Sequence, residues 1–462
     1  MSSGPATTLP SPDRREDGED APFPRLVAVW AGGRATCLDR RVGEAGVRVG
    51  RGGDAELVLD DGSVSRVHAR IGFDGACWTV RDLESRNGTF VDGRRIRGEV
   101  VAARPRVIRV GDALLLPLGD LGGPLAPPEV SGTRVVGARL RQVWATIGAL
   151  AGVSASLYIR GESGSGKELA ARELHRCARP QGPFVAVNGA AIPETLAEAL
   201  LFGARRGAFS GAVEASEGYL RAAHGGVLFL DEVGELSSAI QGKLLRALET
   251  RSVVPVGETR AHPVDLHLCV ATHHDLRERV RSGHFREDLY YRVGRPMVEV
   301  PALRQRPEDL PWLVAAQIAA VDPALRCAPA LIEACLLRPW PGNVRELVTE
   351  IRVAAHQAHT AGRRAVDLAD LAADAGEAIA EVRAPATASA AASGGPASTP
   401  SPGQQRRIDA NEAAIDARRG AIEAALRGAR GNVSEAARVL GVHRTQLRRW
   451  LAHLAIDPAA FG

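Results

Sequence analysis

The chain has 462 residues, which is too long for a single hydrophobic core and suggests about three domains. Its apolar fraction of 45% and charged fraction of 24% are ordinary for globular protein, and no apolar run approaches the roughly 18 residues that a membrane helix needs. The first residues lack the basic-then-apolar order of a signal peptide, and six cysteines without a CxxC pair argue against a disulfide framework or a zinc site, so we expect a cytoplasmic protein with no membrane partner.

Charge is distributed unevenly along the chain. The formal net charge is only +4, but residues 404–452 carry an excess of arginine, which makes that end the candidate nucleic-acid surface. Among 58 basic residues there are only two lysines, Lys167 and Lys243. A lysine that persists in so arginine-rich a chain indicates a position where a compact ammonium is needed.

The predicted elements divide the chain into folded regions joined by polar or low-complexity segments. Short alternating runs separated by Gly and Asp turns predict an all-β sandwich, and strands alternating with helical stretches predict an α/β fold with a parallel sheet. In chain order we expect a disordered tail (1–22), the sandwich (23–119), a linker (120–132), the α/β core (133–305), a helical lid (306–373), a low-complexity linker (374–405) and an all-α segment (406–456).

The stretch GESGSGKE follows a predicted strand and opens a helix, as in a phosphate-binding P-loop. Glycines let the backbone wrap a phosphate, backbone N–H groups and the helix N-terminus point at it, and Lys167 reaches the terminal phosphates. Glu168 stands where a Ser or Thr usually binds magnesium. Within this stretch the residues predicted to bind ATP are Gly161, Glu162, Ser163, Gly164, Ser165, Gly166, Lys167 and Glu168.

A second buried strand, GGVLFLDE, ends in two carboxylates. Nucleotide hydrolysis needs one group to hold Mg²⁺ and another to polarise the attacking water. We therefore expect Asp231 to hold Mg²⁺ through water and Glu232 to act on the water, with ATP and Mg²⁺ as cofactors.

Several motifs over about 240 residues of this region resemble the NtrC-type bacterial enhancer-binding proteins, AAA+ ATPases that activate sigma-54 RNA polymerase. VNGAA, HFREDLYYRV, VPALRQRPEDL and WPGNVREL are similar to the family's segments. The resemblance implies that Asn188 couples Glu232 to the nucleotide state and that Arg286 and Arg292 are arginine fingers for a neighbouring subunit. It also places the second sensor arginine, a further predicted ATP contact, at Arg345.

The stretch GAFSGA is similar to the family's GAFTGA loop, which rises from the ATPase ring and engages sigma-54. The resemblance assigns this contact to Gly207, Ala208, Phe209, Ser210, Gly211 and Ala212. The chain departs from the family pattern at three places: Ser210 replaces a threonine, His273 replaces the asparagine of the first sensor, and Leu200 replaces a glutamate.

Two stretches, VGRGGDAELVLDDGSVSRVHARI and DLESRNGTFVDG, resemble an FHA domain, a β-sandwich whose loops bind phosphothreonine. The resemblance implies that Arg51 and Ser65 contact the phosphate, that Arg66 lies beside them and that Asn87 fixes the peptide backbone. A receiver domain phosphorylated on aspartate needs a lysine, and residues 1–166 contain none. We therefore expect the FHA domain to receive its signal from a phosphothreonine protein that a Ser/Thr kinase has phosphorylated. An FHA fold that only makes protein contacts remains an alternative.

The stretch GNVSEAARVLGVHRTQLRRWL is similar to the Fis-type helix-turn-helix that closes many such activators. Its second helix would enter the major groove of enhancer DNA. The residues predicted to contact bases or phosphates are His443, Arg444, Gln446, Arg448 and Arg449.

Together these features predict a sigma-54-dependent transcription activator: a multidomain chain with an FHA sandwich, an AAA+ P-loop ATPase with a helical lid, and a helix-turn-helix. Its expected partners are sigma-54 RNA polymerase holoenzyme, enhancer DNA, a phosphothreonine protein and further copies of itself, from a dimer to a hexamer. One rival is an FHA-controlled DNA-binding regulator or scaffold whose ATPase drives assembly without engaging sigma-54. A second, an ATP-driven protease or chaperone subunit, leaves the helix-turn-helix unexplained.

Overall fold

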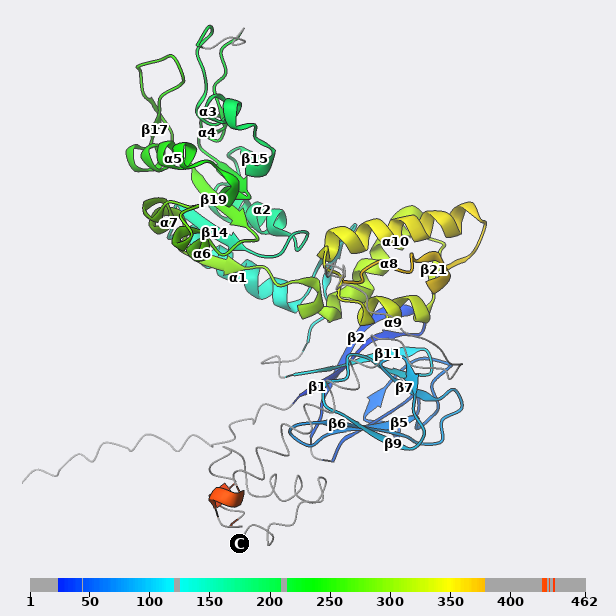
Figure 1. Ribbon diagram of the computed structural model, residues 1–462. Coiled ribbons are helices and arrows are strands. Elements are labelled where there is room, and N and C mark those ends of the chain that lie inside the picture. The colour runs from blue at the N-terminus through cyan, green and yellow to red at the C-terminus, as the bar shows by residue number, and fades with distance from the viewer. Residues whose placement is uncertain are drawn as a thin grey trace, which may run out of the picture.

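The computed structural model describes residues 24–43, 45–119, 125–208, 214–378, 426–429, 432 and 435–436 (Figure 1). Among the described residues, no helix is long and apolar enough to cross a membrane. Several predictions lie outside them: the N-terminal tail, the loop tip Phe209–Ala212, most of the low-complexity linker, and the DNA-binding residues His443, Arg444, Gln446, Arg448 and Arg449.

The N-terminal region is a β-sandwich of two sheets. The six-stranded sheet has the order β2-β1-β11-β10-β7-β8 and the five-stranded sheet the order β4-β3-β5-β6-β9. Apolar side chains of both sheets, such as Leu26 and Ile71, form the core between them. The strands are β1 (Arg25–Ala31), β2 (Arg34–Arg41), β3 (Val47–Gly50), β4 (Leu57–Val58), β5 (Ala69–Phe73), β6 (Trp78–Asp82), β7 (Thr89–Val91), β8 (Arg94–Arg95), β9 (Glu99–Ala102), β10 (Ile108–Val110) and β11 (Ala113–Leu118).

The α/β region contains a parallel sheet in the order β15-β16-β19-β14-β20. Helices cover both of its faces: α1 and α2 pack on one, and α3, α4, α5 and α7 pack on the other. The elements are α1 (Ala138–Ala151), β14 (Ser156–Arg160), α2 (Lys167–Ala178), β15 (Phe184–Asn188), α3 (Glu194–Phe202), α4 (Tyr219–Ala222), β16 (Val227–Asp231), α5 (Ser238–Thr250), β17 (Ser252–Val253), β18 (His262–Pro263), β19 (His267–Thr272), α6 (Leu276–Arg281), α7 (Glu287–Val293) and β20 (Met297–Glu299).

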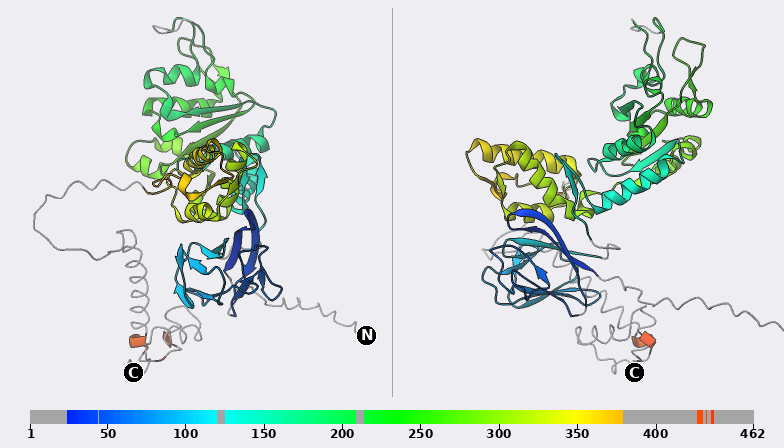
Figure 2. Two further views of the ribbon diagram at one scale, coloured as in Figure 1. Left: turned by 90° about the vertical axis from the view of Figure 1, so that its right-hand side faces the viewer. Right: turned by 180° about the vertical axis from the view of Figure 1, so that it is seen from behind.

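A mostly helical region follows, which we call the lid (residues 301–378). It contains η3 (Leu303–Gln305), η4 (Pro307–Asp309), α8 (Leu310–Val321), β21 (Arg326–Cys327), α9 (Pro329–Leu337), α10 (Asn343–Thr360), β22 (Ala365–Val366) and η5 (Leu368–Asp370). In both figures the lid lies between the sandwich and the α/β region (Figures 1 and 2).

Two stretches expected to be linkers are partly folded. Leu125 is buried in the core that the sandwich shares with the lid, and β12 (Glu129–Ser131) pairs with β13 (Arg134–Val136). Beyond η5, Ala375 is buried in the same core and Gly376 lies against the Trp340 ring. Both segments pack because each has a short apolar or small-residue stretch that the lid can cover.

Candidate functional site

The loop between β14 and α2 turns tightly through two glycines. Gly164 and Gly166 have φ angles of 74° and 108°, in the left-handed region that favours glycine. Gly164 also lies so close to the carbonyl of Gly342 that a β-carbon there would overlap it. The backbone N–H groups at the start of α2 thus face the concave side of a compact loop, a geometry suited to an anion.

Lys167 is the first residue of α2 and is only 6% exposed. Its ammonium donates to the carbonyl of Gly161 at 3.2 Å and lies 3.6 Å from Oε1 of Glu232. A compact ammonium fits between the loop and the neighbouring strand, where a planar guanidinium would need far more room.

Asp231 is the last residue of β16 and Glu232 follows it, so both lie at the carboxyl end of this strand, next to the loop. Glu232 has a φ of 51°, and its Oε2 accepts hydrogen bonds from Thr272 Oγ1 at 3.1 Å and from His273 Nδ1 at 2.9 Å. Burial opposes ionisation of Glu232, but the hydrogen bond from His273 and the charge of Lys167 outweigh it and lower its pKa. Burial and the Glu232 charge raise the pKa of Asp231.

The structure brings His273, rather than Asn188, into contact with Glu232. Asn188 lies opposite Asp231 in the register of β15 and β16, but its side chain accepts a hydrogen bond from the backbone of Ala190 at 3.0 Å. His273 is at the end of β19, and its ring lies 3.8 Å from that of His274. His273, which replaces the asparagine of the family pattern, therefore contacts the Glu232 carboxylate that lies next to Lys167.

Several lid residues contact the P-loop, among them Arg304, whose guanidinium donates to the Glu162 carboxylate. Arg345 donates to Ser163 Oγ at 3.1 Å, Asn343 donates to the carbonyl of Ser163 at 3.0 Å, and Arg306 donates to the carbonyl of Ser165 at 2.8 Å. Sequence reasoning had missed Asn343 and Arg306. A usable signal existed for Asn343, because an asparagine after Pro-Gly readily adopts the left-handed conformation that it has here, with a φ of 54°.

Both candidate arginine fingers lie exposed on and beside α7. Arg286 pairs with Asp288 at 2.7 Å, and Arg292 donates to the carbonyl of Leu248 at 3.3 Å. Between them Tyr291 is 73% exposed. In the part of the chain that the structure describes, neither guanidinium contacts the P-loop of its own chain.

The base of the loop that begins at Gly207 is described, although its tip is not. Arg205 donates its backbone N–H to the carbonyl of Val256 at 2.9 Å, and Ala208 packs against Gly257 between β17 and β18. The two loops project together from the same end of the α/β region (Figure 1).

A second group of predicted residues lies on loops at one end of the sandwich. Arg51, Arg66 and Asn87 are exposed, and Ser65 Oγ accepts the backbone N–H of Arg86 at 3.2 Å. His68 is buried beneath them and joins the loops, because Nδ1 accepts from Ser65 N at 3.1 Å and Nε2 lies 3.1 Å from the carbonyl of Gly88. The predicted phosphate contacts thus gather on one rim of the sandwich.

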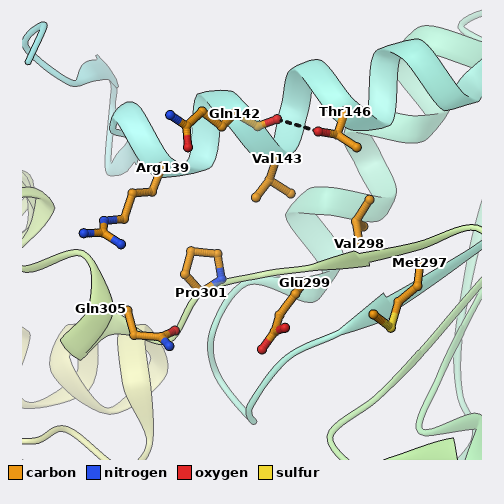
Figure 3. Close-up of a pocket in the computed structure, with 9 residues that line it drawn as sticks. All are labelled: Arg139, Gln142, Val143, Thr146, Met297, Val298, Glu299, Pro301 and Gln305. Carbon is orange, nitrogen blue, oxygen red and sulfur yellow. Dashed lines mark hydrogen bonds between the residues drawn. The ribbon is translucent and has the colours of Figure 1, made fainter. Parts of the chain in front are cut away.

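Another pocket, of about 500 Å³, lies between α1 and β20 (Figure 3). It contains none of the P-loop, Asp231 or Glu232, so it is separate from the site described above. Its lining residues are Arg139, Gln142, Val143, Thr146, Met297, Val298, Glu299, Pro301 and Gln305.

Comparison with known families matches three parts of the chain. Residues 47–117 match the FHA domain, residues 135–299 the sigma-54 interaction domain, and residues 419–453 the bacterial regulatory proteins of the Fis family. The FHA domain, the sigma-54 interaction domain and the Fis-family segment thus follow one another in this order along the chain. The sigma-54 interaction domain is an AAA+ ATPase domain, and the predicted multidomain fold class is confirmed.

Individual relatives match only part of the chain. The transcriptional regulatory protein ZraR of Salmonella typhimurium is 40% identical over 299 residues, which are 63% of this chain and 62% of the relative. The Nif-specific regulatory protein of Herbaspirillum seropedicae is 43% identical over 214 residues, 45% of this chain and 40% of the relative. A crystal structure of NtrX from Brucella abortus in complex with ADP is 32% identical over 70% of each chain, with a TM-score of 0.49. The chain thus spans less than two thirds of the length of these two curated relatives.

Proposed function

We propose that this protein hydrolyses ATP to remodel the closed complex of sigma-54 RNA polymerase holoenzyme, under the control of a phosphothreonine signal that its FHA domain receives. The observation that carries the proposal is the position of Lys167, 3.6 Å from Glu232, at the ends of two parallel strands in a sigma-54 interaction domain. Ligand sites in parallel α/β sheets lie at the carboxyl ends of the strands.

ATP would bind with its phosphates in the loop from Gly161 to Glu168. The backbone N–H groups at the start of α2 and the Lys167 ammonium supply the positive potential. Arg345 reaches the same loop from the lid through Ser163, so the lid would close on the bound nucleotide. Nucleotide binding would therefore change the angle between the lid and the α/β core.

The carboxylate pair also fits Mg²⁺, a hard cation that takes oxygen ligands. Burial and the neighbouring Glu232 charge raise the pKa of Asp231, and a cation would stabilise its ionised form. In the described residues no group of three or more His, Cys, Asp or Glu side chains could hold a metal by itself. Asp231 would hold Mg²⁺ through water, with the substrate phosphates as the remaining ligands; the ion would neutralise phosphate charge.

Hydrolysis would use Glu232 as the group that accepts a proton from the attacking water. As the water oxygen bonds to the γ-phosphorus, the bond from that phosphorus to the bridging oxygen breaks and ADP leaves. Glu232 is suited to this role because its lowered pKa keeps it ionised near neutral pH. Arg286 and Arg292 would stabilise the transferred phosphoryl group of a neighbouring subunit, in an assembly from a dimer to a hexamer, and Asn188 would couple Glu232 to the nucleotide state.

The energy would be delivered through the loop Gly207 to Ala212. Its base packs on the β17–β18 loop, beside α5 at the edge of the ATPase core. Phe209 would present an apolar contact to sigma-54 during part of the cycle. His443, Arg444, Gln446, Arg448 and Arg449 would hold the assembly at enhancer DNA.

The input would be a phosphothreonine protein produced by a Ser/Thr kinase. Arg51, Ser65 and Arg66 offer guanidinium and hydroxyl donors on one rim of the sandwich, which suits a dianion, and Asn87 would fix the peptide backbone. His68 would keep these loops in register.

A second candidate function is an FHA-controlled DNA-binding regulator or scaffold whose ATPase drives assembly only. The hydrogen bond of His273 to Glu232 favours it, because this contact occupies the oxygen that would accept the proton of water. Ser210 adds a second departure, in the loop that would contact sigma-54.

The test is formation of open complexes by purified protein and sigma-54 holoenzyme on a supercoiled sigma-54 promoter. ATP should permit open complexes with the wild type and not with Glu232→Gln. ATP hydrolysis without any open complex would contradict the proposal and support the scaffold function.

A further inference from the structure

The outer face of the six-stranded FHA sheet is covered by the lid of the same chain. Every residue of β1 is buried: Leu26 and Ala28 face the core of the sandwich, whereas Val27 and Val29 face the lid. Both views in Figure 2 show the sandwich against the lid helices. This shared core includes Val27, Val29 and Leu116 from the sandwich and Leu313, Ile332 and Leu336 from α8 and α9.

Polar contacts fix the orientation of the two parts. Arg109 of β10 donates to Glu333 of α9 at 2.9 Å, and its guanidinium stacks 3.5 Å from the Phe90 ring centroid. Arg106 donates to the carbonyl of Leu337, the last residue of α9. A mostly apolar contact closed by a half-buried ion pair is typical of a specific interface, because the pair penalises other registers.

The same arginine touches the rim that carries the phosphopeptide residues. Arg109 donates to the carbonyl of Gly111 at 3.0 Å. The next residue, Asp112, donates its backbone N–H to Ser63 Oγ at 2.8 Å, and the amide of Asn87 donates to the carbonyl of Ser63 at 2.7 Å. Hydrogen bonds, together with the peptide bond between Gly111 and Asp112, therefore connect α9 to Asn87.

The C-terminal end of α9 is tied to the P-loop through the segment that follows it. The indole of Trp340 is 1% exposed and donates to the carbonyl of Cys335 in the last turn of α9 at 2.7 Å. Three residues later, Asn343 donates to Glu162 at 3.1 Å and to the carbonyl of Ser163 at 3.0 Å. The C-terminal turn of α9 and the segment that follows it, up to the start of α10, thus connect the FHA contact with the nucleotide loop.

We propose that the outer face of the FHA sheet is a docking surface for the lid of its own ATPase, and that α9 couples the phosphopeptide rim to the P-loop. Two binding sites that bias one shared element must affect each other reciprocally, so bound nucleotide changes the affinity of the FHA rim for a phosphopeptide by the same factor by which the phosphopeptide changes nucleotide affinity. The ligands named here rest on the proposed function, whereas the docked surface is part of the structure itself.

Amide hydrogen exchange of the full chain, with and without ADP, tests this coupling. Bound ADP should slow exchange in residues 161–168, and it should also change exchange in residues 85–88 and 108–112 of the FHA domain by at least about fivefold. Arg109→Ala should keep the effect at residues 161–168 and lose the effect in the FHA domain. Arg97→Ala, which removes an exposed arginine elsewhere on the sandwich, is the matched control and should behave as the wild type.

Glu333→Gln provides a second route from the lid side, because it removes the charge of the pair and keeps the shape of the side chain. Glu333→Gln should also lose the effect of ADP on the FHA domain, so it can replace Arg109→Ala if that variant fails to fold. The double variant Arg109→Glu/Glu333→Arg should restore part of it, since it reverses the ion pair.

The outcomes separate the two proposals. Protection of residues 161–168 by ADP with no change in the FHA domain would overturn the coupling and leave the ATPase proposal intact. No protection at residues 161–168 would overturn both. A change in the FHA domain that survives in Arg109→Ala and Glu333→Gln alike would also overturn the path through α9.

Discussion

The P-loop and the FHA rim both present donors to a phosphate, but they differ in burial and in the residue that carries the charge. In the P-loop a lysine that is 6% exposed sits inside a glycine loop, and lid residues contact the loop from outside. On the FHA rim the charge belongs to arginines that lie in solvent. A buried ammonium within one loop suits a small ligand, whereas exposed guanidinium groups suit a phosphate that belongs to a larger partner.

The largest effect is expected at the buried lysine of the P-loop. Lys167→Ala should lower ATP affinity by more than about 100-fold, because it removes a desolvated ammonium from the phosphate site. The measurement is equilibrium binding of a fluorescent ATP analogue. Lys243→Ala is the matched control, since this exposed lysine pairs with Glu198 on α3 and should leave affinity unchanged. Equal effects of the two changes would contradict the assignment.

Glu232→Gln separates binding from chemistry within the buried site. The amide has nearly the same shape but cannot take a proton from water, so turnover should fall by about 100- to 10,000-fold while ATP affinity persists. Phosphate release and analogue binding measured on one preparation check both. Retained turnover would show that another group acts as the base.

On the exposed rim, Arg51→Ala should weaken binding of a phosphothreonine peptide by about 10- to 150-fold, the value of one charge-assisted hydrogen bond. Fluorescence anisotropy with the phosphorylated peptide and its unphosphorylated counterpart measures the loss. Arg97→Ala should leave affinity unchanged. If neither peptide binds the wild type, the FHA domain makes only protein contacts.

His273→Ala should produce the smallest change, a displacement of the pH profile. Burial raises the pKa of Glu232, but the hydrogen bond from His273 is the largest of the influences that lower it. Its loss should therefore raise the pKa of Glu232, and the acid limb of kcat against pH should move to higher pH. Steady-state ATPase assays across the acid range measure this displacement, and KM for ATP should stay constant. A limb that moves to lower pH would contradict the contact.

Much of the buried site could be predicted from sequence, because its chemistry depends on local order. A glycine loop before a helix, and a strand that ends in Asp-Glu, define positions that the parallel sheet brings together. The contact between His273 and Glu232 could not be predicted, since it depends on how two strand ends face each other and on the rotamers that pack there.

The sequence indicates that part of the FHA sheet is covered, but it does not indicate that the lid covers it. RLVAVWA in β1 and ALLLPL in β11 do not alternate between apolar and polar residues, as a half-exposed strand would. Such runs indicate that both faces are buried, but the identity of the covering surface depends on tertiary structure. The ion pair of Arg109 and Glu333, 224 residues apart, is equally non-local.

The most direct test of the central claim is a native gel of the purified protein with sigma-54 holoenzyme and a premelted sigma-54 promoter in ADP and aluminium fluoride. We expect a trapped ternary complex with the wild type and none with Phe209→Ala. Absence of the complex with a wild-type protein that hydrolyses ATP would contradict the claim that this ATPase acts on sigma-54.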